Sequence, residues 1–400
     1  MKRLSFILFS LLCFASYSQN PVLKFKGSEH ATIGIYIQDL KTGKMVASVN
    51  PEIVMTPASV LKTITCATAL EVLGSEWKYT TRFNMVGSDP YHGKGNLIIE
   101  AGADPTTGSR EFPDSYHLMD SVVSSLIDRG VDYIEGKVIV DSAILPDGGG
   151  TVAQWELEDV KESYGVGLYP LNWMDNYFEE DFIIPSPTDF FKEQLLESFA
   201  INQIEIAEPT DVVVSDSVET DTLSIYTHYS APLIEIMRNL MFRSDNLMAE
   251  GVLRALSPCE PRDSAISRLK SHWKSKGIDL EYSRIIDGSG LARGNSLSAH
   301  QVGNILTYMA QSNISGEYIS LFPKVAREGT VKTFMRNSKL AGRLALKTGS
   351  MRGVQCFAGY KLNPKNNQPT HTIVVMVNNF FCSRNQLKKS IENYLLQIFP

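Results

Sequence analysis

The chain has 400 residues, a length that allows two or three domains. Its hydrophobic fraction of 43% is ordinary for globular proteins and permits a sizeable core. The net charge of −6 and the pI near 5.7 leave no basic excess, which argues against a nucleic-acid binder. The seven histidines and five cysteines follow no metal-ligand spacing, so we expect neither a metal site nor a cofactor.

The N-terminus has the pattern of an export signal. Lys2 and Arg3 precede an apolar stretch at 4–15, and residues 16–18 offer small side chains for cleavage. Cys13 lies inside that stretch after a leucine, so we do not expect a lipid anchor. No later stretch has the roughly 18 uninterrupted apolar residues of a membrane span. We therefore predict a signal peptide at 1–18 and a soluble periplasmic protein without a stable membrane anchor.

Alternating apolar residues predict a β-hairpin at 31–49, followed by a buried helix that starts near Ser59. After residue 75 the composition changes, and aromatic and acidic residues mix with glycine and proline. We expect an inserted, strand-rich region over 76–225 whose turns lie at these glycines and prolines. Its predicted elements are strands at 79–86, 96–100 and 133–140 and an amphipathic helix at 113–129.

Helical periodicity returns at Ser230 and is interrupted at 243–246. A glycine-rich loop at 286–291 comes before a helix with a predicted capping box of Ser298 and Gln301. The remaining predicted elements are helices through 250–256, at 261–276 and at 385–398, and strands at 343–347, 355–361 and 372–377.

Together these elements predict an α+β fold. The hairpin and the three late strands would complete one antiparallel sheet with flanking helices, and the Ser59 helix would be central. We predict that residues 19–75 and 226–400 form this domain and that residues 76–225 are an excursion from it.

Ser59 and Lys62 carry the chemistry that we predict. Lys62 is the only charged side chain between residues 55 and 70, and it shares a helix face with Ser59 three residues earlier. Burial disfavours an ammonium ion, so we expect an amine that is substantially neutral near pH 7 and can act as general base for the Ser59 hydroxyl. Residues 267–270 and 271–274 repeat the S-x-x-K pattern, but in a charged helix where we expect no such role.

Lys347, Thr348, Gly349 and Ser350 end a predicted strand near the C-terminus. The Lys347 amine and the Thr348 hydroxyl are suited to hold a terminal carboxylate. Gly349 has no Cβ to block a close approach of substrate backbone. The backbone N–H groups of Ser350 and Ser59 would form an oxyanion hole.

Ser244 and Asn246 lie at the predicted helix break, where a hydroxyl and an amide could relay a proton and hold a substrate amide. Short patterns of this kind recur by chance, as at 41–43 for K-T-G and at 48–50 for S-x-N. Order and context decide: S-x-x-K opens a buried helix, S-D-N falls between helices and K-T-G ends a late strand, as in penicillin-binding proteins and class A β-lactamases.

With these motifs the chain resembles type-4 low-molecular-mass penicillin-binding proteins, serine D-Ala-D-Ala carboxypeptidases and endopeptidases of peptidase family S13. Residues 287–291 (D-G-S-G-L) are similar to that family's D-G-S-G-L-S-R segment, 347–354 to its K-T-G-T-L-x-G-V, and 102–105 to a G-x-D-P turn. The long gap between Ser59 and Ser244, 184 residues, resembles the family's insertion within the catalytic domain. Ser350 stands where threonine is usual, and 292–294 depart from the pattern.

The resemblance implies a penicillin-binding-protein/β-lactamase-like domain that hydrolyses D-alanyl-D-alanine or cross-link bonds in peptidoglycan stem peptides. It implies an acyl-enzyme on Ser59 and covalent inhibition by β-lactams. The implied catalytic residues are Ser59, Lys62, Ser244 and Asn246, and the implied substrate-binding residues are Lys347, Thr348, Gly349 and Ser350.

Rival functions share the scaffold. A β-lactamase or an esterase would use the same acyl-enzyme, and a noncatalytic wall-binding protein would need none of these residues. Carboxypeptidase and endopeptidase action stay open, as do the oligomeric state and a Cys356–Cys382 disulfide. Asp141 or Asp175 could bind an amino group of the stem peptide, although a solvated acidic surface is the simpler explanation for both.

Overall fold

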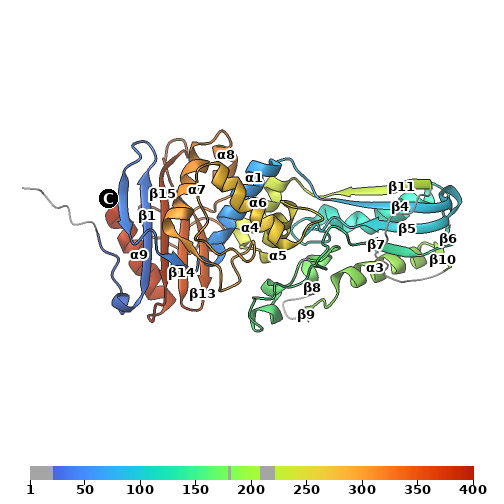
Figure 1. Cartoon of the computed structure of the whole chain (residues 1–400), viewed down its shortest axis with the longest axis horizontal. Helices are drawn as coiled ribbons and strands as arrows, with labels where there is room; N and C mark the ends of the chain where they lie inside the picture. Colours follow the sequence, from blue (N-terminus) through green and yellow to red (C-terminus); the bar gives the residue numbers. More distant parts are fainter. Residues whose placement is uncertain (1–20, 179–181, 208–220) are drawn as a thin grey trace, which may run out of the picture.

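The computed structural model describes residues 21–178, 182–207 and 221–400. The predicted signal peptide and Cys13 therefore lie outside the described residues. Within the described part, the chain forms an elongated molecule with a five-stranded sheet at one end and a separate four-stranded sheet at the other (Figure 1). No helix of this part combines the length and apolarity needed to cross a membrane.

The five-stranded sheet is antiparallel throughout and has the order β13-β14-β15-β1-β2. It joins the N-terminal hairpin to the C-terminal strands, as predicted. Its strands are β1 (Thr32–Asp39), β2 (Met45–Val49), β13 (Leu344–Met351), β14 (Val354–Leu362) and β15 (Pro369–Asn378). β13 is an edge strand, which matters for the site described below.

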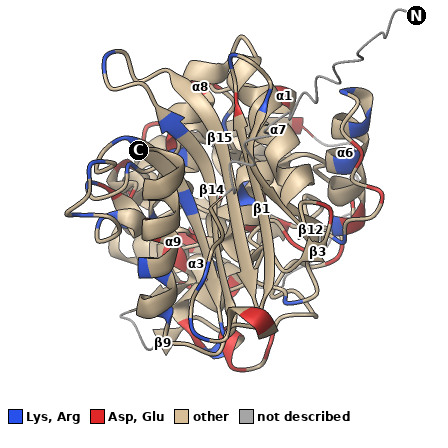
Figure 2. Ribbon diagram, turned by 90° about the vertical axis from the view of Figure 1, so that its left-hand side faces the viewer, with Lys and Arg blue, Asp and Glu red and all other residues tan. Residues whose placement is uncertain are grey.

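Helices cover both faces of this sheet. Successive side chains of a strand point to opposite faces, and Ile35 packs in the cluster beneath α9 whereas Tyr36 packs with α1 and α7. Figure 2 shows α9 lying across the face remote from the second sheet. The helices of this part are α1 (Leu61–Leu73), α4 (Leu233–Arg243), α5 (Asn246–Ala255), α6 (Arg262–Ser275), α7 (Ala299–Gln311), α8 (Ser315–Ser320) and α9 (Arg384–Ile398).

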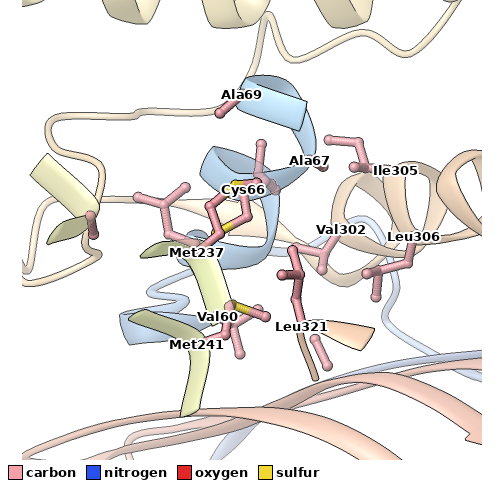
Figure 3. Close-up of a cluster of buried hydrophobic side chains, with 14 of the residues drawn as sticks. Val60, Cys66, Ala67, Ala69, Met237, Met241, Val302, Ile305, Leu306 and Leu321 are labelled. Carbon is pink, nitrogen blue, oxygen red and sulfur yellow. The ribbon is translucent and has the colours of Figure 1, made fainter. Parts of the chain in front are cut away.

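α1 is the centre of the core. All residues from Leu61 to Leu70 are buried, so this part of the helix is surrounded on every side, as its sequence predicts, with Lys62 as the one charged side chain. Figure 3 shows Cys66 among apolar side chains of α1, α4 and α7. Cys66 is thus the small core residue that its position suggests. The predicted capping box of Ser298 and Gln301 does begin α7.

The four-stranded sheet has the order β11-β4-β5-β7 and packs against α2 and α3. β4 comes first in the chain and β11 last, and these two strands are neighbours in the sheet, with Thr80 opposite Tyr229. The chain therefore enters and leaves this region side by side. The elements are β4 (Thr80–Asp89), β5 (Lys94–Glu100), α2 (Leu118–Ile127), β7 (Val138–Asp141), α3 (Pro187–Ile201) and β11 (Asp221–Tyr229), with two-residue strands at β6 (Tyr133–Ile134), β8 (Tyr177–Phe178), β9 (Phe182–Ile183) and β10 (Glu205–Ile206).

Three details differ from the prediction. The single strand expected at 133–140 is two strands, β6 and β7, separated by a bend at Gly136, where a Cβ would meet the backbone of Gly95 at 2.5 Å. α3 was not predicted, although its buried Phe191, Leu195 and Phe199 recur every four residues. β11 was also missed, and it runs across the predicted 225–226 boundary.

Candidate active site

Ser59 lies in a short 3₁₀ turn, Ala58–Val60, that leads directly into α1. Ala58 has φ +47°, a left-handed conformation that is costly for a residue with a Cβ. A Cβ on Gly290 would lie 2.1 Å from the Ala58 carbonyl oxygen, so the loop at 287–291 packs directly against this turn. The half-buried Ser59 side chain is thereby held at the surface end of a rigid, buried helix.

Lys62 is fully buried and its amine faces the Ser59 hydroxyl. Lys62 Nζ lies 3.0 Å from Ser59 Oγ and donates to Asn246 Oδ1 at 2.6 Å and to the Ser289 carbonyl oxygen at 2.7 Å. Burial lowers the pKa of Lys62 to about 8, partly offset by Asp287 and other nearby carboxylates. The predicted direction is correct. The predicted extent is not, because the carboxylates keep most of the amines protonated at pH 7.

Glu250, on the buried side of α5, holds the loop that touches Lys62. Glu250 Oε1 accepts hydrogen bonds from the backbone N–H groups of Gly288 and Ser289, both at 3.0 Å, and Oε2 pairs with Arg262. Desolvation raises the pKa of Glu250, and Arg262 opposes that effect. The carboxylate therefore holds the backbone N–H of Ser289, the residue whose carbonyl oxygen accepts from Lys62.

Asp287 is the second buried acid of this loop. Its two oxygens accept from the backbone N–H of Gly290 at 2.8 Å, that of Ala292 at 2.6 Å and the Asn295 amide at 2.8 Å. They also accept from the indole N–H of Trp155 at 2.9 Å. All four partners are donors, so both oxygens of this buried side chain are hydrogen-bonded. Trp155 belongs to the chain segment between β7 and β8, and its hydrogen bond joins that segment to the loop.

Ser244 and Asn246 lie at the α4–α5 junction, as predicted. Ser244 ends α4 in a left-handed conformation, φ +65°, and Asp245 caps α5 by accepting from the Met248 N–H at 2.8 Å. The Asn246 amide has both ends engaged, since its oxygen accepts from Lys62 and its nitrogen donates to the Tyr164 carbonyl oxygen at 2.7 Å. These two contacts fix the orientation of the amide.

Lys347 on β13 is also fully buried. Its amine donates to Ser244 Oγ and to its neighbour Thr348 O, both at 2.8 Å. Burial, and then the charge of Lys62, lowers the pKa of Lys347 well below its usual value. The Thr348 hydroxyl meets Thr330 Oγ1 at 3.0 Å. Lys62 and Lys347 are thus two buried amines near the Ser59 turn. Lys62 has carboxylate neighbours, whereas Lys347 has none among the described residues.

The role of Gly349 differs from our expectation. A Cβ there would lie 2.5 Å from the Pro57 carbonyl oxygen and 3.1 Å from the Ser59 nitrogen, so the missing side chain makes room for the protein's own Ser59 turn. Leu346 donates its N–H to Pro323 on the open side of β13, and N–H directions alternate along a strand. Ser350, four residues further, therefore directs its backbone N–H to the same open edge.

A pocket of 510 Å³ opens beside this cluster. Ser244 and Asn246 line it from the helix junction, Tyr164 and Asp175 from the other side, and Thr330 from the segment before β13. Asp175 thus faces the pocket. The other acid considered, Asp141, ends β7 and is not among the lining residues.

The structure brings together all of the predicted motifs and separates them from their chance repeats. Ser267 and Ser271 are exposed on α6, and Lys41 and Thr42 form a turn around the Asp39 carboxylate. The predicted residues that line the pocket or contact one another are Ser59, Lys62, Ser244, Asn246, Lys347, Thr348 and Gly349, whereas Ser350 follows them on the same strand. Cys356 and Cys382 are not bonded to each other.

Four contributors to the site were not predicted as such: Glu250, Asp287, Trp155 and Tyr164. Glu250 carried a visible signal, because it is a lone acid in a stretch that is otherwise apolar on its buried face. Asp287 begins the D-G-S-G-L segment at 287–291, but no role was predicted for its side chain. Tyr164 acts through its backbone, for which side-chain patterns carry no signal.

The sequence matches the D-Ala-D-Ala carboxypeptidase 3 (S13) family over residues 20–185 and 182–397, nearly the whole chain. The chain belongs to this family. The S13 chain is 27% identical over 342 residues to carboxypeptidase DacB of Mycolicibacterium smegmatis, with 81% of this chain and 72% of the relative covered. It is 22% identical over 428 residues to D-alanyl-D-alanine carboxypeptidase DacB of Haemophilus influenzae, covering 89% and 88%.

Solved structures agree on the fold of this S13 protein. Penicillin-binding protein 4 (dacB) from Haemophilus influenzae superposes with a TM-score of 0.82 at 18% identity, over 93% of this chain and 97% of the other. A penicillin G-acylated predatory endopeptidase from Bdellovibrio bacteriovorus gives 0.53 at 16% identity, over 92% of both chains. The predicted α+β, penicillin-binding-protein-like fold and the predicted family are therefore confirmed.

Proposed function

We propose that this S13 enzyme is a periplasmic serine hydrolase that cleaves the peptide bond after a D-alanine in peptidoglycan stem peptides, in a D-alanyl-D-alanine end or in a cross-link. The observation that carries the proposal is the buried Lys62 amine, 3.0 Å from the Ser59 hydroxyl. A base beside a hydroxyl at the end of a buried helix is the requirement for nucleophilic catalysis by serine. Export through residues 1–18 would deliver the enzyme to its substrate.

The reaction would begin with the neutral form of Lys62. Ser59 Oγ attacks the peptide carbonyl carbon while its proton passes to Lys62. The oxygen of the tetrahedral intermediate lies between the N–H groups of Ser59 and Ser350, where one such donor contributes about 3–4 kcal/mol. The C–N bond then breaks, and the proton returns to the departing amine, with the Ser244 hydroxyl as relay. Water cleaves the Ser59 ester by the same steps in reverse.

The substrate contacts would come from the pocket wall and from strand β13 beside it. Asn246, held by Lys62 and Tyr164, would hold an amide of the peptide. Lys347 and Thr348 would bind the terminal carboxylate, and a penicillin carboxylate would occupy the same place. We assign these roles to the domain made of residues 19–75 and 226–400, and we regard 76–225 as an insertion that completes the pocket.

The test is labelling with fluorescent penicillin followed by mass spectrometry of the modified peptide. We expect one adduct on Ser59, no label on Ser59→Ala and full label on the matched double variant Ser267→Ala/Ser271→Ala. The wild-type protein should also release D-alanine from a peptide that ends in D-Ala-D-Ala. An adduct on Ser267 or Ser271 would refute the assignment, and rapid turnover of penicillin would indicate a β-lactamase instead.

A further inference from the structure

The segment at 324–343 carries a concentrated positive charge in an otherwise acidic chain. It contains six lysines and arginines but one acid, Glu328, whereas the whole chain has a net charge of −6. We call this stretch the basic segment. It leads directly into β13, the edge strand that carries Lys347. A local field of this sign attracts anions over several ångströms of solution.

The charges of the basic segment point to solvent and are not neutralised by the protein. Arg327, Lys332, Arg336, Lys339 and Arg343 are all exposed. Across residues 21–178, 182–207 and 221–400, none of these five cations forms an ion pair. Surface lysines and arginines elsewhere in the chain do find acids, as Arg243 does with Glu111 at 2.7 Å. Five exposed cations without an acidic partner among the described residues therefore remain available for an external anion; Arg336 also donates to the Lys332 carbonyl oxygen at 3.0 Å.

The basic segment adjoins the candidate active site. Lys332 and Thr330 line the 510 Å³ pocket, and Thr330 contacts the Thr348 hydroxyl. The segment also pairs with the edge strand through a bridge between Lys324 and Ala345. In Figure 2, blue stretches gather on the side of the sheet to the left of β14, the side on which β13 lies. A polymer that enters the pocket from this side must pass over these cations.

We propose that the basic segment is a docking surface for the peptidoglycan polymer, through the carboxylates of stem peptides next to the one being cleaved. This inference rests on the proposed function, which supplies a substrate that is repetitive and polyanionic. The pocket would bind one peptide end, and the basic segment would bind its neighbours. Two linked contacts raise the affinity for the polymer without changing that for a single short peptide.

A membrane surface suits the basic segment less well. Stable adsorption to a bilayer usually combines cations with apolar side chains that enter the headgroup region. Of the large hydrophobic side chains that are exposed in the described residues, none lies between 324 and 343. Charge without an apolar anchor favours a hydrated polyanion.

The test removes charge at a distance from the pocket. The triple variant Arg336→Gln/Lys339→Gln/Arg343→Gln leaves Lys332 and every proposed site residue intact. The matched control, Lys41→Gln/Lys44→Gln/Lys94→Gln, removes the same charge from exposed lysines on the distal β1–β2 turn and on β5. Binding to insoluble peptidoglycan is measured by co-sedimentation at about 0.05 M and about 0.5 M salt, since salt screens exposed charges.

We expect the triple variant to bind peptidoglycan roughly tenfold more weakly than wild type at low salt, with the difference lost at high salt. The control variant should bind like wild type, and both variants should be acylated by fluorescent penicillin at the wild-type rate. Unchanged binding of the triple variant, or an equal loss in the control, overturns the proposal. So does a loss confined to vesicles of phosphatidylglycerol, which would identify a membrane site.

Penicillin acylation separates this proposal from the proposed function. A wild-type protein that binds peptidoglycan but is never acylated would refute the Ser59 chemistry and leave the docking result readable. A triple variant that has lost acylation as well as binding would show damage to the pocket, and the docking surface would then be rejected.

Discussion

The pH dependence of acylation tests the central pair most directly. With a pKa of about 8, Lys62 is neutral in about 1% of molecules at pH 6, about 9% at pH 7 and about half at pH 8. A lysine with an ordinary pKa would be roughly 300-fold less available as a base at pH 7. The base must be deprotonated to take the Ser59 proton, so the rate must increase with pH. We expect the second-order rate constant of penicillin acylation, which reports the free protein, to rise about tenfold from pH 6 to pH 7 and to stop rising above about pH 9.

The measurement is stopped-flow or quenched-flow acylation with a fluorescent penicillin, with thermal melts to verify folding at each pH. The variant Asp245→Asn provides an internal check, since asparagine caps a helix as well as aspartate does. The Asp245 carboxylate raises the pKa of Lys62, so its removal should move the rising limb to lower pH. A rate that is flat from pH 6 to pH 9, or that rises only near pH 10, would show that Lys62 is not the base.

Further predictions concern the support of the site. Gly349→Ala places a Cβ 2.5 Å from the Pro57 carbonyl oxygen, next to the Ser59 turn, and should slow penicillin acylation at least about tenfold. The control Gly316→Ala, on an open helix face, should not slow it. Equal rates for the two variants would contradict this packing. Trp155→Phe removes one of four donors to Asp287 and should lower the unfolding free energy in urea by about 1–3 kcal/mol; no change would deny the bond its structural role. Glu250→Gln breaks the buried ion pair with Arg262 and should lower the unfolding free energy by about 3–5 kcal/mol in the same assay. A decrease of less than about 1 kcal/mol would contradict this role of the pair.

The fold of the main domain could be predicted well because its patterns are local. β14 and β15 are apolar runs with clear ends, and the predicted strands agree with them within a few residues. The region between β4 and β11 was harder. Its helix α3 has an apolar repeat, but the surrounding prolines and aromatics favoured strands, and packing against the second sheet decided the outcome.

The site could be predicted as a set of motifs, but not as a set of contacts. Ser59 and Lys62 are three residues apart, so helix geometry alone places them together. The 2.8 Å contact between Lys347 and Ser244 joins residues 103 apart, and only the assembled sheet and helices can make it. The effect of Asp287 on the pKa of Lys62 was likewise out of reach, because it depends on where a loop packs.

The two buried lysines differ in a way that bears on the order of events. Burial lowers the pKa of both, but Lys62 has Asp287, Asp245 and Glu250 nearby, whereas Lys347 has the opposing charge of Lys62. The carboxylates therefore favour a proton on Lys62, the group that must lose it to act as base, over one on Lys347. These groups are coupled, so the proton belongs to the pair.

A bound carboxylate would reverse this distribution. An anion beside Lys347 favours its charged form, and a charged Lys347 in turn disfavours charge on Lys62. The bound substrate would thus favour the charged form of Lys347, the residue that binds it, and increase the share of neutral Lys62. The saturated acylation rate should then level off at high pH, while the second-order rate constant should fall there, because the free Lys347 has no proton left to hold the carboxylate. Parallel profiles for the two constants would show that the lysines titrate independently.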